Sequence, residues 1–154
     1  MKLADPLAPA AKNRRPSKKS YVLEDQVGFV LRQVNQRHTV IFMERIGDEL
    51  TPTLWAALVK LLQQGPCTQN LLGRLTAMDA ATIKGVIDRL TKRGLTETGF
   101  DPDDARRLVV TLTEAGREVA TRALTNAQAI TEETLAPLTQ GERQILLELL
   151  KKLR

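Results

Sequence analysis

The chain contains one cysteine, Cys67, among 154 residues. A single thiol excludes an internal disulfide framework and a cysteine-rich metal site, and it is typical of a reducing compartment. No apolar run approaches the roughly 18 residues that a membrane-spanning helix needs. No apolar segment with a cleavage site follows the basic N-terminus, so the sequence shows no secretory signal. We therefore expect a cytoplasmic protein with no membrane partner.

Aromatic residues and β-strand patterns are also scarce. Aromatics make up 3% of the chain, and alternating β-branched runs are almost absent, which argues against a β-sandwich or barrel. Catalytic motifs are missing as well, because we find no Ser/His/Asp constellation, GxGxxG loop or HExxH. His38 is the one histidine, so a histidine zinc site cannot be completed. We expect no enzyme, no metal and no cofactor.

Basic charge is concentrated at the N-terminal end. The formal net charge is +5, and residues 1–20 carry six basic side chains against Asp5 alone. The other 134 residues balance 17 basic with 17 acidic side chains. Because this segment also holds three prolines, we expect a disordered basic tail over residues 1–20. It is either a solubilising end or an arm that follows phosphates.

Residues 21–50 predict a long amphipathic helix. Apolar side chains recur at helical spacing from Leu23 to Ile46, about seven turns, and His38 lies on the same stripe. Gly47 and Asp48 end the pattern. A helix this long with one apolar stripe is typical of packing against a partner, so we interpret it as a dimerisation helix.

Residues 51–113 predict three helices and a hairpin. Thr51, Thr68 and Asp79 are expected N-caps, and the helix after Asp79 has small or basic side chains on its outward face. Strands over 95–100 and 108–112 then flank the charged loop Asp101–Arg107. A helix from Thr113 and a last helix opened by the capping box at Thr139 complete the chain.

This order predicts a mostly α fold with a winged helix-turn-helix over 51–113 and dimerisation helices over 21–50 and 114–154. A major groove about 12 Å wide admits one helix, whose outward side chains must be short, polar or basic. An arginine at the tip of a hairpin can reach the adjacent minor groove, where a narrow width raises the negative potential. The pattern therefore favours duplex DNA as the partner.

Three segments carry recognisable motifs: residues 82–95, Asp101–Arg107 and Thr111–Gly116, in which Asp104-x-Arg106 precedes Leu112-Thr113-x-x-Gly116. The resemblance is to the MarR family of bacterial transcriptional regulators, and it is most specific at this last spacing. It implies a homodimer that binds a pseudopalindromic operator, with a recognition helix over 79–93. Gly85 and Ala105 depart from the family pattern, in which larger polar or basic residues are usual. The residues expected to contact DNA are Thr68, Gln69, Asn70, Ala81, Thr82, Lys84, Gly85, Arg89, Asp104, Arg106 and Arg107.

A finer resemblance is to members that regulate catabolism of aromatic acids. It rests on residues 27–32, 36–38, 50–52 and 69–74. It implies a repressor released by an aromatic acid or by an aromatic acyl-CoA thioester such as hydroxycinnamoyl-CoA. The candidate effector residues are Arg32, Arg37, His38, Arg45 and Trp55. The structural interpretation of His38 and Trp55 is that they are core or interface residues, and the arginines are equally explained as a solvated basic face.

A second class of function stays open at this point. Winged helices also serve as interaction modules that bind RNA or protein. The sequence alone does not give the operator, the regulated genes, the effector or the sign of regulation.

Overall fold

The computed structural model describes residues 21–47 and 50–154, in which it shows six α-helices and one two-stranded antiparallel sheet. The elements are α1 (Val27–Ile46), α2 (Pro52–Gln64), α3 (Gln69–Leu75), α4 (Ala80–Lys92), β1 (Thr96–Phe100), β2 (Leu108–Leu112), α5 (Glu114–Thr134) and α6 (Gln140–Lys152). This confirms the predicted mostly helical fold with a hairpin. The predicted tail over residues 1–20 lies outside the described residues. No helix in the described part of the chain is long and apolar enough to cross a membrane.

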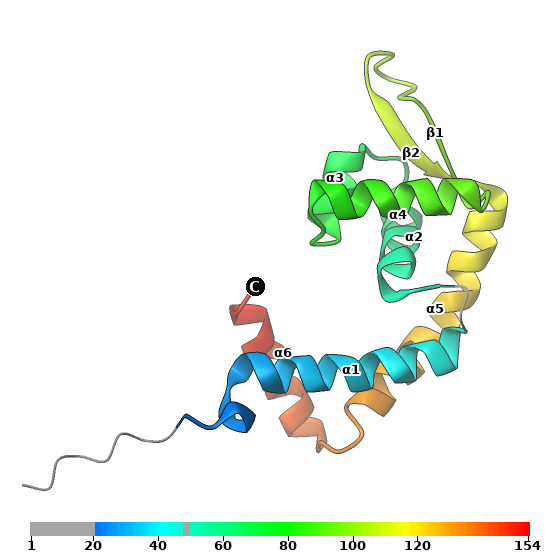
Figure 1. Cartoon of the computed structure of the whole chain (residues 1–154). Coiled ribbons are helices and arrows are strands. Elements are labelled where there is room, and N and C mark those ends of the chain that lie inside the picture. The colour runs from blue at the N-terminus through cyan, green and yellow to red at the C-terminus, as the bar shows by residue number, and fades with distance from the viewer. Residues whose placement is uncertain (1–20, 48–49) are drawn as a thin grey trace, which may run out of the picture.

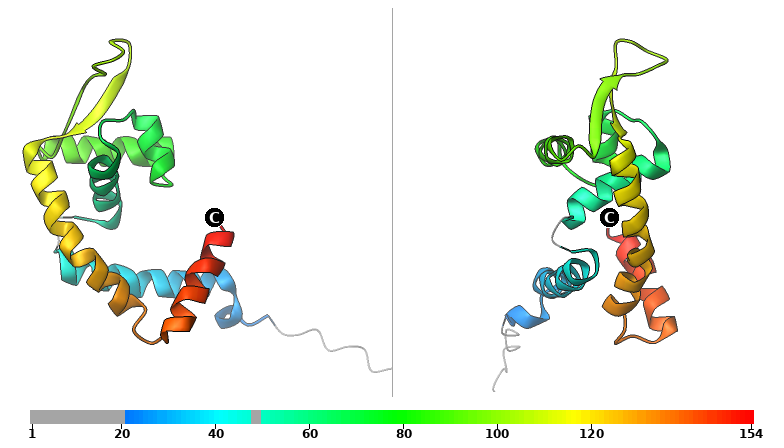
Figure 2. Two further views of the ribbon diagram at one scale, coloured as in Figure 1. Left: turned by 180° about the vertical axis from the view of Figure 1, so that it is seen from behind. Right: turned by 90° about the vertical axis from the view of Figure 1, so that its right-hand side faces the viewer.

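The helices form two bodies joined by α5 (Figures 1 and 2). We call α2, α3, α4 and the β1–β2 hairpin the reading lobe, and α1, α6 and the C-terminal half of α5 the arm. The hairpin projects from the reading lobe at the end far from the arm. Because α5 contacts both α1 and α2, it fixes how the lobe sits on the arm.

Side-chain caps begin the helices where the sequence predicts them. Thr51, Thr68 and Asp79 each accept a hydrogen bond from the backbone N–H three residues on, at α2, α3 and α4. Thr139 and Glu142 form a reciprocal capping box at α6. Each cap satisfies a donor that the first helical turn leaves unpaired.

The first helix is shorter than predicted. A 3₁₀ turn spans Leu23–Asp25, and α1 begins only at Val27. Between them Gln26 is extended, with its backbone N–H donating to Leu23 O at 3.0 Å and its side-chain Nε2 to Val22 O at 2.7 Å. These local bonds break the helix that the apolar spacing alone suggests.

The main core lies inside the reading lobe. Its fully buried side chains include Leu58 of α2, Leu72 of α3 and Ile83, Val86 and Leu90 of α4. The arm has a smaller cluster of Ile41, Phe42 and Ile130. No residue of α6 is buried, and the arm keeps apolar side chains of α1 and α6 exposed.

Candidate nucleic-acid interface and effector cavity

The helix α4 presents the outward face that the sequence predicts for DNA contact. Ile83, Val86, Ile87 and Leu90 are buried, while Ala81, Thr82, Lys84 and Arg89 are exposed. Gly85 is half-buried, and a β-carbon added there would meet no atom within 4 Å. The face is therefore open to a groove along the first two turns.

The N-terminal cap of α4 is charged. Asp79 Oδ1 accepts from the Thr82 N–H at 2.7 Å, and this backbone hydrogen bond lowers the pKa of the Asp79 carboxyl. The carboxylate also lies at the positive end of the helix dipole. The cap consequently stays ionised at neutral pH and fixes the start of α4.

A close approach between α3 and α4 sets the angle of the helix-turn-helix. A β-carbon at Gly73 would stand 3.1 Å from Met78 O and 3.2 Å from Ile83 Cγ2. The turn between the helices also holds Ala77 in the left-handed region, with φ of 54°. On α3, Thr68 and Gln69 are half-buried and Asn70 is exposed. These three predicted contacts therefore lie at the start of the helix that precedes α4.

The wing, which is the β1–β2 hairpin, is attached directly to the helix-turn-helix. Cys67 and Val110 exchange backbone hydrogen bonds, with N–O distances of 3.2 and 2.9 Å. Cys67 is buried, and desolvation raises the pKa of its thiol, so its environment is that of a small apolar residue. This link holds β2 against the residue that precedes the Thr68 cap.

The wing tip exposes Arg106 and Arg107 and is braced by its aspartates. Asp104 Oδ1 accepts from the backbone N–H of Arg106 at 3.0 Å, and an Asp101 oxygen lies 3.9 Å from the Arg107 guanidinium. In the sequence Asp104 stands two residues before Arg106, close enough to hold its guanidinium. In the structure Asp104 instead orients the backbone of residue 106, because its short side chain closes a local turn. The Arg106 side chain is left facing solvent.

Three predicted effector residues of α1 contact the C-terminal end of α5. Both terminal nitrogens of Arg37 donate to backbone carbonyls there, Nη1 to Thr134 O and Nη2 to Glu133 O, the latter at 2.9 Å. Arg45 donates to Glu133 Oε2 at 2.7 Å, and His38 Nδ1 lies 2.9 Å from Thr134 Oγ1. These bonds join α1 to α5, and those of Arg37 bring donors to two backbone carbonyls of the last turn of α5.

A cavity of about 180 Å³ lies between the arm and the reading lobe. Two predicted effector residues, His38 and Trp55, line it, and Phe42 packs edge-on against Trp55 with ring centroids 5.9 Å apart. Its other walls are Pro52, Ala56, Ala127, Ile130 and Thr131. Arg32, Arg37 and Arg45 lie outside this lining. The α5 residues are missed by the sequence reasoning, because only folding brings them beside α1.

The indole nitrogen of Trp55 is buried without a partner. Among the described residues, it is the one buried side-chain N or O atom without a hydrogen-bond partner. An unpaired buried donor carries a desolvation cost that a hydrogen-bond acceptor removes. Trp55, which lines the cavity, therefore has an unused hydrogen-bond donor.

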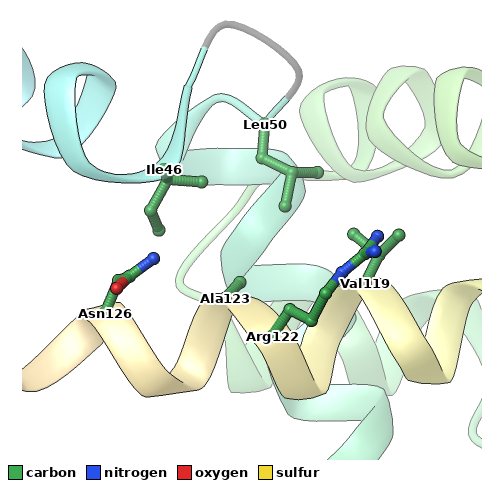
Figure 3. A pocket seen from close by; sticks show the side chains of 6 residues that line it. All are labelled: Ile46, Leu50, Val119, Arg122, Ala123 and Asn126. Atoms are coloured by element: carbon green, nitrogen blue, oxygen red, sulfur yellow. The ribbon is translucent and has the colours of Figure 1, made fainter.

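A second, smaller hollow of about 110 Å³ lies beside the end of α1 (Figure 3). Ile46 and Leu50 face Val119, Arg122, Ala123 and Asn126 of α5 across it. Asn126 Nδ2 donates to Arg45 O at 3.3 Å. This hollow contains none of the predicted site residues and lies where α5 passes from the lobe to the arm.

The sequence and fold are similar to those of known regulators. The MarR family model matches residues 50–108. The HTH-type transcriptional repressor NicR of Pseudomonas putida is 39% identical over 134 residues, which cover 86% of this chain and 85% of NicR. The chain belongs to the MarR family. It is accordingly a DNA-binding winged helix-turn-helix regulator and not an enzyme, as the sequence predicts.

Two solved structures extend the likeness over the arm. A probable transcriptional regulator from Pseudomonas aeruginosa is 56% identical with a TM-score of 0.80, covering 86% of this chain and 100% of that one. BpsR of Bordetella bronchiseptica is 38% identical with a TM-score of 0.81, covering 86% and 96%. BpsR is described with regulation of its DNA binding by 6-hydroxynicotinic acid. The likeness to MarR-family structures thus spans both bodies of the chain.

Proposed function

We propose that this MarR-family protein is a cytoplasmic, homodimeric repressor of genes for aromatic-compound catabolism. It binds a pseudopalindromic duplex operator and releases it when a single-ring aromatic acid fills the cavity between α1, α2 and α5. The observation that carries the proposal is a cavity lined by Trp55, a residue whose indole N–H is buried and has no hydrogen-bond partner. The similarity to NicR, a repressor, and to BpsR supports the same sign of regulation and class of effector.

The exposed apolar surface of the arm supports a dimer. Leu31 and Val34 of α1 and Leu147 and Leu150 of α6 line an open groove that one copy of the chain leaves uncovered. Leu149 and Ile145 extend this surface along α6. Contiguous exposed apolar residues of this kind mark a partner surface. A second copy of the arm covers them and sets two reading lobes side by side.

The dimer explains how the operator is read. Two α4 helices about 34 Å apart enter successive major grooves on one face of the duplex. Thr82, Lys84 and Arg89 then lie on the groove side of α4, and the α3 residues Thr68, Gln69 and Asn70 lie beside them. The wing places Arg106 over the neighbouring minor groove, while Arg107 stays beside Asp101. Contacts to the DNA phosphates position the protein, and contacts from α4 to the bases specify the sequence.

The cavity favours a free aromatic acid over a CoA thioester. Its volume of about 180 Å³ compares with a cavity of about 150 Å³ that binds benzene, and drug-sized ligands occupy roughly 300–1,000 Å³. Arg37 and Arg45, two of the candidate effector residues, are bonded to the end of α5. A ring with one carboxylate therefore fits, with Trp55 Nε1 donating to it and His38 presenting its second ring nitrogen.

Release of DNA follows from where the cavity lies. Its walls come from α1 and α5 of the arm and from α2 of the reading lobe, so an occupant changes how the lobe sits on the arm. The ligand alters the spacing of the two α4 helices only by as much as its affinity differs between the two arrangements. A small rotation at the cavity is carried to α4 because the lobe core is closely packed.

Trp55 supplies a direct test, because it is the one tryptophan of the chain. We expect its fluorescence to change on titration with 6-hydroxynicotinic or 4-hydroxybenzoic acid and not with 4-hydroxybenzoyl-CoA. The same acid releases duplex DNA in a gel shift, and duplex RNA of equal sequence is not bound. Binding of the thioester alone would contradict the assigned ligand class.

A conservative variant isolates the indole donor. Trp55→Phe keeps an aromatic ring and removes the N–H, so calorimetry is expected to show weaker binding of the acid. Its melting temperature in the absence of ligand is the control for folding. Equal affinity of variant and parent would exclude Trp55 as the hydrogen-bond donor.

A further inference from the structure

The middle of the outward face of α4 carries few long side chains. At 3.6 residues per turn, positions 81, 85, 88 and 92 lie opposite the buried side of this helix. Ala81 and Gly85 occupy the first two of these positions. Small residues let a helix lie close to the floor of a groove. Asp88 is the first residue along this line whose side chain can hydrogen-bond to a base.

Asp88 forms an ion pair with Lys84 on the groove side of the helix. Lys84 Nζ lies 2.7 Å from Asp88 Oδ2, and the side chains are 64% and 61% exposed. Exposed pairs one turn apart contribute little to the stability of a helix. Helix stability therefore does not explain why a carboxylate lies on the face of α4 that is proposed to approach the negatively charged DNA.

The Lys84 ammonium and the Asp88 carboxylate are complementary to two neighbouring groups on the major-groove edge of a base pair. In the major groove a G·C pair presents guanine O6 as an acceptor beside the cytosine N4 amino group as a donor. These two base atoms are hydrogen-bonded to each other in the pair, so they are separated by the length of a hydrogen bond. Lys84 Nζ and Asp88 Oδ2, at 2.7 Å, offer a donor and an acceptor at the matching separation.

We propose that Lys84 and Asp88 act as one unit that reads the order of an acceptor and an amino group at one base pair of each operator half-site. Lys84 donates to guanine O6 or thymine O4, while Asp88 accepts from cytosine N4 or adenine N6 across the pair. At the reversed pairs C·G and A·T the two groups exchange places, so the Asp88 carboxylate meets an acceptor oxygen and is repelled. Asp88 thus discriminates between base pairs, and Lys84 contributes attraction to the DNA. This inference rests on the proposed operator binding.

The test is selection of duplex DNA from a random-sequence pool by the parent and by variants. We expect the parent to disfavour C·G and A·T pairs at one position of each half-site, and Asp88→Asn to relax that discrimination by about tenfold or more. The amide also favours adenine there, because it pairs with adenine N6 and N7. Lys84→Ala relaxes the same position and weakens binding overall.

A matched control removes one exposed carboxylate from a helix other than α4. Glu118 lies on α5 and is exposed, so Glu118→Gln changes the net charge equally and leaves every base preference as in the parent. Circular dichroism confirms that the variants fold. Unchanged preferences in Asp88→Asn, or relaxation by Lys84→Ala at a different position, would overturn the shared readout. A parent that enriches no sequence would overturn both this inference and the proposed operator binding.

Discussion

A β-carbon on Gly116 would stand 1.9 Å from the carbonyl oxygen of Leu95. The same carbonyl accepts from the Thr113 N–H at 3.1 Å, and Thr113 Oγ1 donates to Gly94 O at 2.6 Å. The first turn of α5 is thereby fastened to the turn that follows α4. Because α5 continues into the arm, this junction joins the end of α4 to the arm.

Substitution of Gly116 by alanine is expected to destabilise the fold. The added methyl group overlaps backbone atoms, which cannot rotate away as a side chain can, so the free energy of unfolding falls by about 1–3 kcal/mol or more. Urea denaturation measures the change. Gly141→Ala is the control, since a β-carbon at residue 141 meets no atom within 4 Å. Equal stability of the two variants would contradict the close packing.

Substitution of Arg106 by alanine is expected to weaken operator binding by about 1–3 kcal/mol and to reduce the salt slope by roughly one. The reason is loss of a cation that faces the narrow minor groove. Binding titrations at several salt concentrations measure both quantities. Lys152→Ala, at the end of α6, removes an equal charge away from the reading lobe. If Arg106→Ala binds as the parent does, the wing has only a structural role.

Acid is expected to weaken the cap of α4. The Thr82 N–H lowers the pKa of Asp79 below the value of about 3.9 of an unfolded chain. The stabilisation is therefore fully present above that unfolded value and is lost as the pH falls through the folded one. Asp79→Asn caps a helix nearly as well and does not titrate. Melting temperatures followed from pH 6 downward should fall less steeply in this variant, and parallel curves would refute the assignment.

Substitution of Leu150 by glutamate is expected to convert the dimer into monomers. Leu150 lines the apolar groove of the arm, and a buried unpaired carboxylate in an interface costs several kcal/mol. Light scattering measures the mass, and operator binding is lost with the dimer. Leu108→Glu is the matched control, because Leu108 is an exposed leucine of the wing. A dimer that survives Leu150→Glu would place the interface elsewhere.

Local signals in the sequence determined most of the secondary structure and the identity of the reading lobe. Thr51, Thr68 and Asp79 each cap the predicted helix, because a cap is decided by a few neighbouring residues and their hydrogen bonds. The outward face of α4 follows in the same way from helical periodicity. The start of α1 was wrong by four residues, since Gln26 forms local bonds that an apolar pattern does not report.

Only the tertiary structure decided which residues share a site. Arg37, His38 and Arg45 lie on one helix with Arg32, yet His38 lines the cavity while Arg37 and Arg45 bind the end of α5, about 90 residues away along the chain. Asp104 lies close to Arg106 in sequence, but it binds the backbone N–H and not the guanidinium. Helical spacing shows which side chains point the same way, whereas the partner of each one depends on how helices far apart in sequence pack together.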